Sequence, residues 1–246
     1  MKKWLHAFFM AWGMFLAVPC PYRKWDENAR DRMLVCLPLV GCIVGGLWAL
    51  AAWLLSLIKA PVYISAALLA ALPWGVTGFI HLDGFMDVSD AVLSRRDLET
   101  RQRILKDPHC GAFAVISLGL LMLVSFAVLL SWKFSAVKLV PLALIPAAVR
   151  ASAGAAVLLF KPMSTSQYSR ERDKRLCIPL FIMLAAAAVP IIFFGLGGLA
   201  PLAAAGAYWL FALYGKKQLG GMNGDISGFA LTLGELVGTI ILVFVR

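Results

Sequence analysis

Charged residues are scarce in this sequence: of its 246 residues, 15% are Asp, Glu, Lys or Arg, whereas 61% are hydrophobic. A soluble domain of average composition has about 25% charged and about 45–50% apolar residues. Because folded soluble domains still expose much of their surface, a chain of this length has no core large enough to bury so much apolar side chain. The composition excludes an ordinary soluble domain and predicts a protein whose solvent is the lipid bilayer.

The long apolar runs also lack the alternation of polar and apolar residues that is typical of membrane-spanning strands. Continuously apolar runs fit helices, because a helix satisfies its own backbone hydrogen bonds in lipid. We therefore predict an all-α, polytopic helical membrane protein with a single domain over residues 1–246. It would have six or seven spans of roughly 20 residues, drawn from the runs at about 34–57, 62–80, 112–131, 139–160, 177–194, 199–214 and 226–245.

The N-terminal stretch from Trp4 to Val18 is apolar and follows two lysines, as the start of a signal peptide does. It lacks the small-residue pattern of a cleavage site, because the chain continues Pro19-Cys20-Pro21-Tyr22. We therefore expect a retained interfacial or re-entrant helix that enters the bilayer only part of the way.

Cysteine pairs and the common nucleotide and hydrolase motifs are missing as well. The five cysteines contain no CxxC pair, and their odd number gives no disulfide framework or zinc site. Small apolar packing residues are the simpler interpretation. No GxSxG, Walker A, GxGxxG or HExxH motif occurs. Any chemistry must therefore come from another constellation.

Basic residues outnumber acidic ones, and the formal net charge is +10. Sixteen of the 23 Lys and Arg residues fall in four segments, 21–33, 81–110, 161–176 and 215–225. The positive-inside rule places these segments in the cytoplasm and predicts a multi-pass protein of the cytoplasmic (inner) membrane. Cationic loops of this kind contact anionic lipid headgroups, so we expect membrane lipid and no nucleic acid as a partner.

The 13 acidic residues are few and one-sided, since 12 of them fall in the same four segments. The thirteenth, Glu235, lies inside the last apolar run. A protein that moves a solute across the bilayer is expected to carry polar groups on both sides or at mid-depth. The distribution favours an enzyme with a cytoplasmic active site over a divalent-cation transporter, which is kept as an alternative.

The sharpest pattern is HLDGFMDVSD at 81–90, in which Asp83, Asp87 and Asp90 are spaced i, i+4, i+7. On a helix these positions share one face, where three like charges repel. A bound hard cation would relieve the repulsion, and Mg²⁺ takes carboxylate and phosphate oxygens together. The simpler alternative is a solvated helix face at the membrane edge. Gly84 would let a phosphate approach closely.

Two further clusters accompany the acidic stripe. Arg95, Arg96, Lys106 and Asp107 lie just downstream, and the basic ones suit a phosphate clamp, although positive-inside topology alone also explains them. The glycine-rich LGGMNGDISG at 219–228 contains Asp225, and Glu235 follows ten residues later. An ionisable group at such depth in a span is a functional candidate that faces the bundle interior.

Taken together, these residues resemble the adenosylcobinamide-GDP ribazoletransferase, or cobalamin synthase, family. HLDGFMDVSD (81–90) is similar to that family's HLDG-x-x-D-x-x-D core, and KDPHCGAF (106–113) to its Lys-Asp-x-x-x-Gly-x-Phe segment. LGGMNGDISG with Glu235, FLAVPCP (15–21) and LPLVGCIVG (37–45) also fit. The resemblance extends over nearly the whole chain in the same order.

The resemblance implies a Mg²⁺-dependent transferase that completes cobalamin. Adenosylcobinamide-GDP and α-ribazole, or α-ribazole 5′-phosphate, would give adenosylcobalamin, or its phosphate, and GMP. The ribazole 3′-hydroxyl would attack the phosphate attached to cobinamide. Both acceptor forms stay open, and an oligomer is compatible with the sequence.

The candidate roles follow from this chemistry, because phosphoryl transfer depends on positioning and charge stabilisation. Asp83, Asp87 and Asp90 are the expected metal ligands and, with His81, the candidates for accepting the hydroxyl proton. The expected substrate-binding residues are Arg95, Arg96, Lys106, Asp107, Asp225 and Glu235. The active-site segment would be about 81–110.

A CDP-alcohol phosphotransferase of lipid synthesis is the nearest alternative enzyme, because such enzymes also cluster Asp residues on a membrane helix. Their signature has Ala-Arg shortly after the Asp-Gly. Here Asp83-Gly84 is followed by Phe85-Met86-Asp87, so the pattern does not match.

Overall fold

The computed structural model describes residues 2–22, 24–163 and 173–245, and within these ranges the chain is helical with one isolated β-bridge, Pro162 to Met222. The prediction of an all-α fold is confirmed. The α-helices are α1 (Lys2–Phe15), α2 (Arg30–Val35), α3 (Leu37–Leu57), α4 (Val62–Val76), α5 (Ile80–Leu93), α6 (Leu98–Ile104), α7 (Ala112–Leu130), α8 (Leu139–Leu159), α9 (Cys177–Ala186), α10 (Val189–Phe194), α11 (Ala200–Leu219) and α12 (Gly224–Phe244).

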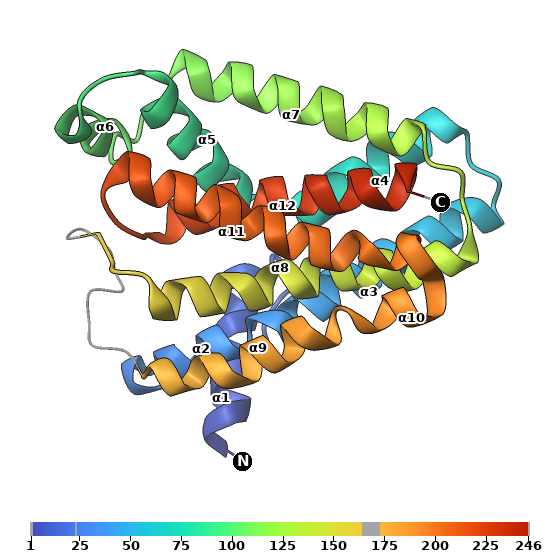
Figure 1. Ribbon diagram of the computed structural model, residues 1–246, viewed down its shortest axis with the longest axis horizontal. Coiled ribbons are helices and arrows are strands. Elements are labelled where there is room, and N and C mark those ends of the chain that lie inside the picture. The colour runs from blue at the N-terminus through green and yellow to red at the C-terminus, as the bar shows by residue number, and fades with distance from the viewer. Residues whose placement is uncertain (1, 23, 164–172, 246) are drawn as a thin grey trace.

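Among the described residues, five helical segments are long and apolar enough to cross a membrane, or six if the bent pair α4–α5 counts as one span. The sequence predicted six or seven spans. One of the five segments, Lys174–Leu219, has 46 residues. Figure 1 shows that it runs along α9 and α10 and returns along α11. The predicted run 177–194 is therefore divided into two shorter helices.

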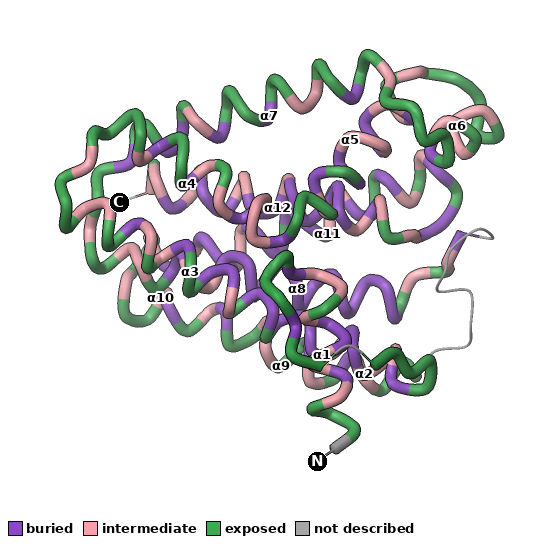
Figure 2. The backbone as a smooth tube through the Cα atoms, turned by 180° about the vertical axis from the view of Figure 1, so that it is seen from behind, coloured by how far each residue is buried: buried purple, intermediate pink, exposed green. Residues whose placement is uncertain are grey.

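The helices differ in how much of their surface the protein covers. In the apolar 18-residue stretch of α7, 28% of the residues are buried by the rest of the protein, whereas 78% are buried in the corresponding stretch of the segment that contains α8. Figure 2 shows this contrast, with α8 mostly buried and α7 mostly exposed. Exposed apolar side chains such as Leu123 on α7 and Trp53 on α3 are stable in a bilayer, because lipid rather than water surrounds them.

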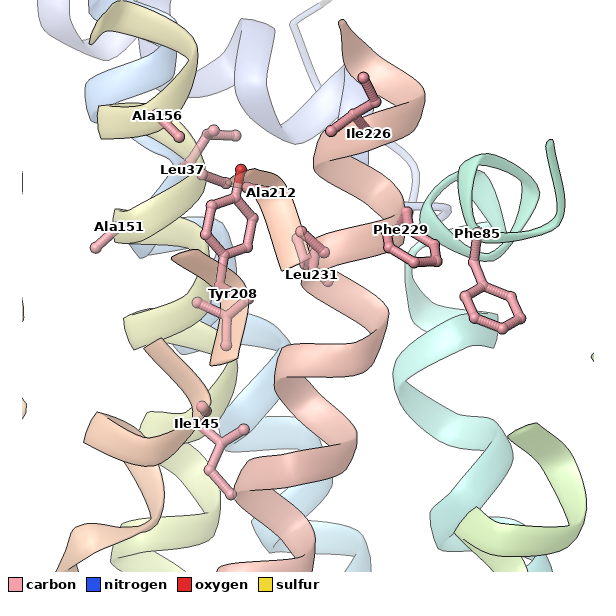
Figure 3. Close-up of a cluster of buried hydrophobic side chains, with 14 of the residues drawn as sticks. Leu37, Phe85, Ile145, Ala151, Ala156, Tyr208, Ala212, Ile226, Phe229 and Leu231 are labelled. Carbon is pink, nitrogen blue, oxygen red and sulfur yellow. The ribbon is translucent and has the colours of Figure 1, made fainter. Parts of the chain in front are cut away.

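The core forms where α3, α8, α11 and α12 meet. Figure 3 shows Leu37, Ile145, Tyr208 and Leu231 from these four helices gathered in one cluster. Close packing depends on small residues, because a Cβ on Gly45 of α3 would clash with the Ala143 carbonyl oxygen of α8. Such small-residue contacts let helix backbones approach closely, as is usual in membrane bundles.

The predicted span 62–80 is interrupted. The helix α4 ends at Val76, and α5 begins at Ile80 with its axis bent by 93° relative to α4. Gly78 and Phe79 between them have φ angles of 60° and 63°. A left-handed conformation cannot continue a right-handed helix, so this turn separates the acidic helix from the span.

The loops divide between two ends of the bundle. In Figure 1, α5, α6 and the start of α12 lie at one end, whereas the α3–α4 and α7–α8 connections and the C-terminus lie at the other. This separation agrees with the two sets of loops expected from the distribution of charge, although part of the segment 161–176 lies outside the described residues. The 14-residue α1 is about 21 Å long, shorter than the roughly 30 Å hydrocarbon core.

Candidate active site

The acidic stripe lies on α5, so Asp83, Asp87 and Asp90 are on a helix as their spacing predicted. The opposite side of the same helix is buried. Phe85 of α5 stacks on Phe229 of α12 with ring centroids 5.8 Å apart, and Figure 3 shows the two rings side by side. The apolar residues between the aspartates therefore fix α5 against the bundle, and the stripe is directed away from that contact.

A fourth carboxylate, Asp225, stands in the first turn of α12. Asn223 caps this helix by accepting a hydrogen bond from the Ile226 N–H at 2.9 Å, and its Nδ2 donates to Asp225 Oδ2 at 2.7 Å. The α12 backbone touches α5 here, because a Cβ on Gly84 would lie 2.9 Å from the Asp225 Cα and carbonyl oxygen. Glycine at position 84 is thus required for the approach of Asp225, and the structure joins two clusters that the sequence showed separately.

The four carboxylates form one negatively charged group. The charges of Asp83, Asp225 and Asp90 all act on Asp87. Within the described part of the chain, none of the four pairs with an Arg or Lys side chain within 4.0 Å. Uncompensated like charges destabilise a fold unless a cation binds, so this donor set of hard oxygens fits Mg²⁺.

The carboxylates do not enclose a complete metal site by themselves. No three His, Cys, Asp or Glu side chains of the described residues lie close enough together to hold a metal ion. Mg²⁺ in enzymes is usually bound by one or two carboxylates together with waters and substrate phosphates. The arrangement therefore suits a metal ion that binds with a phosphorylated substrate.

Asp90 lies against the start of α7. Its Oδ1 accepts a hydrogen bond from the Ala114 N–H at 3.4 Å, and a Cβ on Gly111 would clash with both of its carboxylate oxygens. The positive end of the α7 helix dipole favours a carboxylate at this place. The two segments predicted to be functional, 81–90 and 106–113, are therefore in direct contact.

The basic candidates lie on the surface beside the stripe. Arg95, Arg96 and Lys106 are exposed, and Arg95, two residues after the end of α5, has a φ of 54°. Asp97 caps α6 by accepting hydrogen bonds from the Thr100 N–H and hydroxyl, which lower the pKa of Asp97. Asp97 thus serves as the cap of α6, whereas the three basic side chains are accessible to an anionic ligand.

The segment that carries these basic residues, which includes α6, is anchored by two residues that the sequence analysis did not select. Arg101 of α6 donates to the side chain of Gln218, and Gln102 Nε2 donates to the Leu219 carbonyl oxygen at 2.8 Å. These contacts attach α6 to the end of α11, close to the glycine-rich turn. No local signal marks them, because the partners are separated by 117 residues.

The predicted binding residue Asp107 is engaged by its neighbour. Its Oδ1 accepts hydrogen bonds from the backbone N–H of His109 at 2.9 Å and from the His109 ring at 2.7 Å. These bonds lower the pKa of Asp107. Both side chains are exposed, so the pair shapes the loop before Gly111 and leaves Asp107 accessible to solvent.

His81 is not brought to the carboxylate stripe. It lies two residues before Asp83, about 200° around the helix, and its ring stacks on Phe15 at 5.8 Å with the planes 17° apart. Its Nε2 is buried and has no hydrogen-bond partner among the described residues. The Thr232 hydroxyl donates to its carbonyl oxygen at 3.2 Å, which ties the start of α5 to α12.

Glu235 is also remote from the stripe. It forms a buried ion pair with Arg150 of α8, with 2.7 Å between Glu235 Oε1 and Arg150 Nη1. Ten residues of α12 separate it from Asp225, or about 15 Å. Sequence reasoning did not select Arg150, although an isolated Arg inside an apolar run was a usable signal.

Comparison with known proteins supports the resemblance that the motifs carry. A family described as cobalamin-5-phosphate synthase matches residues 7–243. An adenosylcobinamide-GDP ribazoletransferase of Clostridium perfringens (strain 13 / Type A) is 38% identical over 98% of this chain and 99% of its own length. Proteins of the same name from Clostridium botulinum (strain Alaska E43 / Type E3) and Halalkalibacterium halodurans are each 34% identical, over 97% and 96% of this chain and 97% and 94% of their own lengths. No solved structure matches this chain.

Proposed function

The chain belongs to the cobalamin-5-phosphate synthase family, and from that premise we propose that it joins adenosylcobinamide-GDP to α-ribazole, or its 5′-phosphate, at the carboxylates of α5. It is a transferase of cobalamin biosynthesis. The observation that carries the assignment of the site is the contact of α5 with α12, which adds Asp225 to the stripe of Asp83, Asp87 and Asp90.

One or two carboxylates of the stripe formed by Asp83, Asp87 and Asp90 would hold Mg²⁺ together with a substrate phosphate, and Asp225 of α12 adds its negative charge to the same group. When bound, the ion supplies positive charge that neutralises the diphosphate and stabilises the departing GMP. The residues fit this role, because their carboxylates lack cationic partners in the described structure and their oxygens are the ligands that Mg²⁺ prefers.

The reaction replaces the phosphoanhydride bond of the diphosphate with a phosphate ester bond. The ribazole 3′-oxygen forms a bond to the phosphorus attached to cobinamide, and the bond from that phosphorus to GMP breaks. The hydroxyl proton passes to a nearby base, for which a carboxylate of the stripe is better placed than His81, whose ring stacks on Phe15. The chain's main contribution is to hold the two substrates in line.

The exposed basic side chains after α5 would contact the phosphates. Arg95 and Arg96 follow shortly after the end of α5, and Lys106 lies two residues after the end of α6. Arginine binds phosphate oxygens through two parallel hydrogen bonds, which fixes orientation as well as charge. The attachment of α6 to α11 through Gln102 and Leu219 keeps this basic loop at the acidic end of the bundle.

The membrane location follows from the helices, whereas the side is part of the proposal. Several segments are long and apolar enough to span a bilayer. We place the protein in the inner membrane with α5 and α6 toward the cytoplasm, because most of the basic residues lie in segments at this end. Soluble substrates made in the cytoplasm would then reach the site directly.

Turnover by the purified protein tests the proposal. The protein in detergent is mixed with adenosylcobinamide-GDP, α-ribazole or α-ribazole 5′-phosphate, and Mg²⁺, and GMP and the corrinoid product are separated by chromatography. We expect both products in equal amounts, and neither after chelation of the metal. A folded protein that forms no product with either acceptor would refute the reaction at this site, and metal uptake by vesicles would then test cation transport.

A further inference from the structure

A large cavity lies beside α1, outside the carboxylate site. It has a volume of about 520 Å³, is open to the surface on one side, and is lined by α1 and by described residues of the segment that follows it, between Leu16 and Tyr22 and at Lys24 and Trp25. Small-molecule sites typically occupy roughly 300–1,000 Å³ and are lined mainly by apolar and aromatic side chains with a few polar groups. The cavity has the size of a binding site, and the reaction at the carboxylates does not account for it.

The cavity adjoins the helix that carries the carboxylates. Ala17, on its wall, donates its backbone N–H to the Val76 carbonyl oxygen at 2.8 Å, just before the turn into α5. Two residues earlier, Phe15 stacks on His81 in the first turn of α5. A ligand in the cavity therefore lies next to the beginning of α5, the helix that carries the carboxylates.

The walls favour a flat, apolar ring. Phe9, Tyr22 and Trp25 line the cavity, and the Phe9 and Tyr22 rings are 5.9 Å apart. The Cys20 thiol already donates to carbonyl oxygens of this region. Among the described residues that line the cavity, Lys24 alone is charged. Aromatic rings on the walls suit stacking against a flat ring.

This chemistry distinguishes the two substrates. Guanine has several donors and acceptors on its edges, and burying them without partners is costly. A benzimidazole ring has few such groups and loses little in an apolar cavity. Lys24 at the wall suits the phosphate that the ribose of such a base can carry.

We propose that this cavity binds the benzimidazole base of the ribazole substrate and so orients its ribose toward α5. The inference rests on the proposed function, because it assigns one of the two substrates of that reaction. The guanine base and a lipid acyl chain are the competing occupants, and they become outcomes of the test.

Gly13 offers a way to fill the cavity without disturbing its walls. It lies on α1 and lines the cavity, and an added Cβ would meet Cys20 at 3.7 Å, an ordinary contact. The longer side chain of Gly13→Leu therefore occupies the cavity. Gly206→Leu on α11 is the matched control, since a Cβ there has nothing within 4 Å.

The measurement is the KM of each substrate in steady-state turnover by the wild-type protein and both variants. We expect Gly13→Leu to raise the KM for α-ribazole at least about tenfold and to leave the KM for adenosylcobinamide-GDP within about twofold. Gly206→Leu should change neither. If Gly13→Leu does not fold, Trp25→Ala repeats the test. It removes a half-exposed ring from the cavity and adds no bulk to the protein interior.

The opposite results overturn the inference. A raised KM for adenosylcobinamide-GDP alone assigns the cavity to guanine, and unchanged KM values with less co-purified lipid assign it to an acyl chain. Calorimetric titration of α-ribazole, without the other substrate, separates this failure from that of the reaction. If the wild-type protein turns over but binds α-ribazole no better than Gly13→Leu does, only the assignment of the base to this cavity is refuted. Protein that binds ribazole through the cavity but makes no product refutes only the reaction.

Discussion

Arg150 and Glu235 form an ion pair in the interior of the bundle, with 2.7 Å between Nη1 and Oε1 and with 1% and 6% of their side chains exposed. The pair joins α8, the most enclosed helix, to α12. The same α12 presents Asp225 to α5 at its first turn. We interpret the ion pair as the contact that fixes the position of α12 and thereby of the fourth carboxylate.

Removing one partner should be much worse than removing both. Arg150→Met leaves the Glu235 carboxylate buried without its counter-charge, which typically costs about 3–5 kcal/mol. The double variant Arg150→Met/Glu235→Leu has no buried charge, so most of that loss should be recovered. Thermal unfolding in detergent measures both, and a double variant no more stable than Arg150→Met would contradict this interpretation.

Gly84→Ala should push α5 away from α12. Its Cβ would lie 2.9 Å from backbone atoms of Asp225, which cannot move as a side chain can, and overpacking of this kind costs about 1–3 kcal/mol. We expect a lower unfolding temperature together with reduced kcat. The control is Gly46→Ala on α3, where a Cβ has nothing within 4 Å. Wild-type stability and turnover in Gly84→Ala would show that the close contact is unimportant.

Gly111→Ala should separate activity from stability. Its Cβ would clash with the Asp90 carboxylate, but a carboxylate at the end of a side chain can rotate away at little cost. We expect near-wild-type unfolding and a loss of kcat of about 10- to 100-fold, because small displacements of catalytic groups are costly. Gly119→Ala in α7 provides the comparison, since its Cβ meets nothing within 4 Å. Unaltered turnover in Gly111→Ala would show that the position of Asp90 does not matter for the reaction.

Arg96→Ala should weaken binding of the diphosphate substrate. Hydrogen bonds to charged groups contribute about 1.5–3 kcal/mol, so the KM for adenosylcobinamide-GDP should rise about tenfold or more, while the KM for unphosphorylated α-ribazole should change little. Lys133→Ala, an exposed cation in the α7–α8 connection at the other end of the bundle, is the control. Equal effects of the two substitutions would indicate a general influence of charge.

The helical fold and the acidic stripe could be predicted because both depend on local patterns. Continuous apolar runs specify helices in lipid, and the i, i+4, i+7 spacing of Asp83, Asp87 and Asp90 places them on one face of α5. The addition of Asp225 was not visible in the sequence. It depends on the close contact of Gly84 with α12, between segments about 140 residues apart in the sequence.

Two other features escaped prediction for similar reasons. The break after Val76 depends on a left-handed Gly78–Phe79 turn, whose neighbour Val76 accepts a hydrogen bond from distant Ala17. Glu235 was expected to bind substrate, and pairing it with Arg150 required knowing that α8 and α12 are neighbours. Two isolated ionisable residues of opposite charge in separate apolar runs were the available signal.

We propose that the carboxylates of α5 hold Mg²⁺ at the diphosphate of the substrate. The most direct test is the rate of GMP release as a function of Mg²⁺ concentration for the wild-type protein, Asp83→Asn and Glu99→Gln, whose exposed carboxylate in the neighbouring α6 lies outside the stripe. We predict that Asp83→Asn needs at least about tenfold more Mg²⁺ for its half-maximal rate or loses turnover, while Glu99→Gln follows the wild-type curve. A wild-type Mg²⁺ dependence and rate in Asp83→Asn would show that Asp83 does not hold the metal ion.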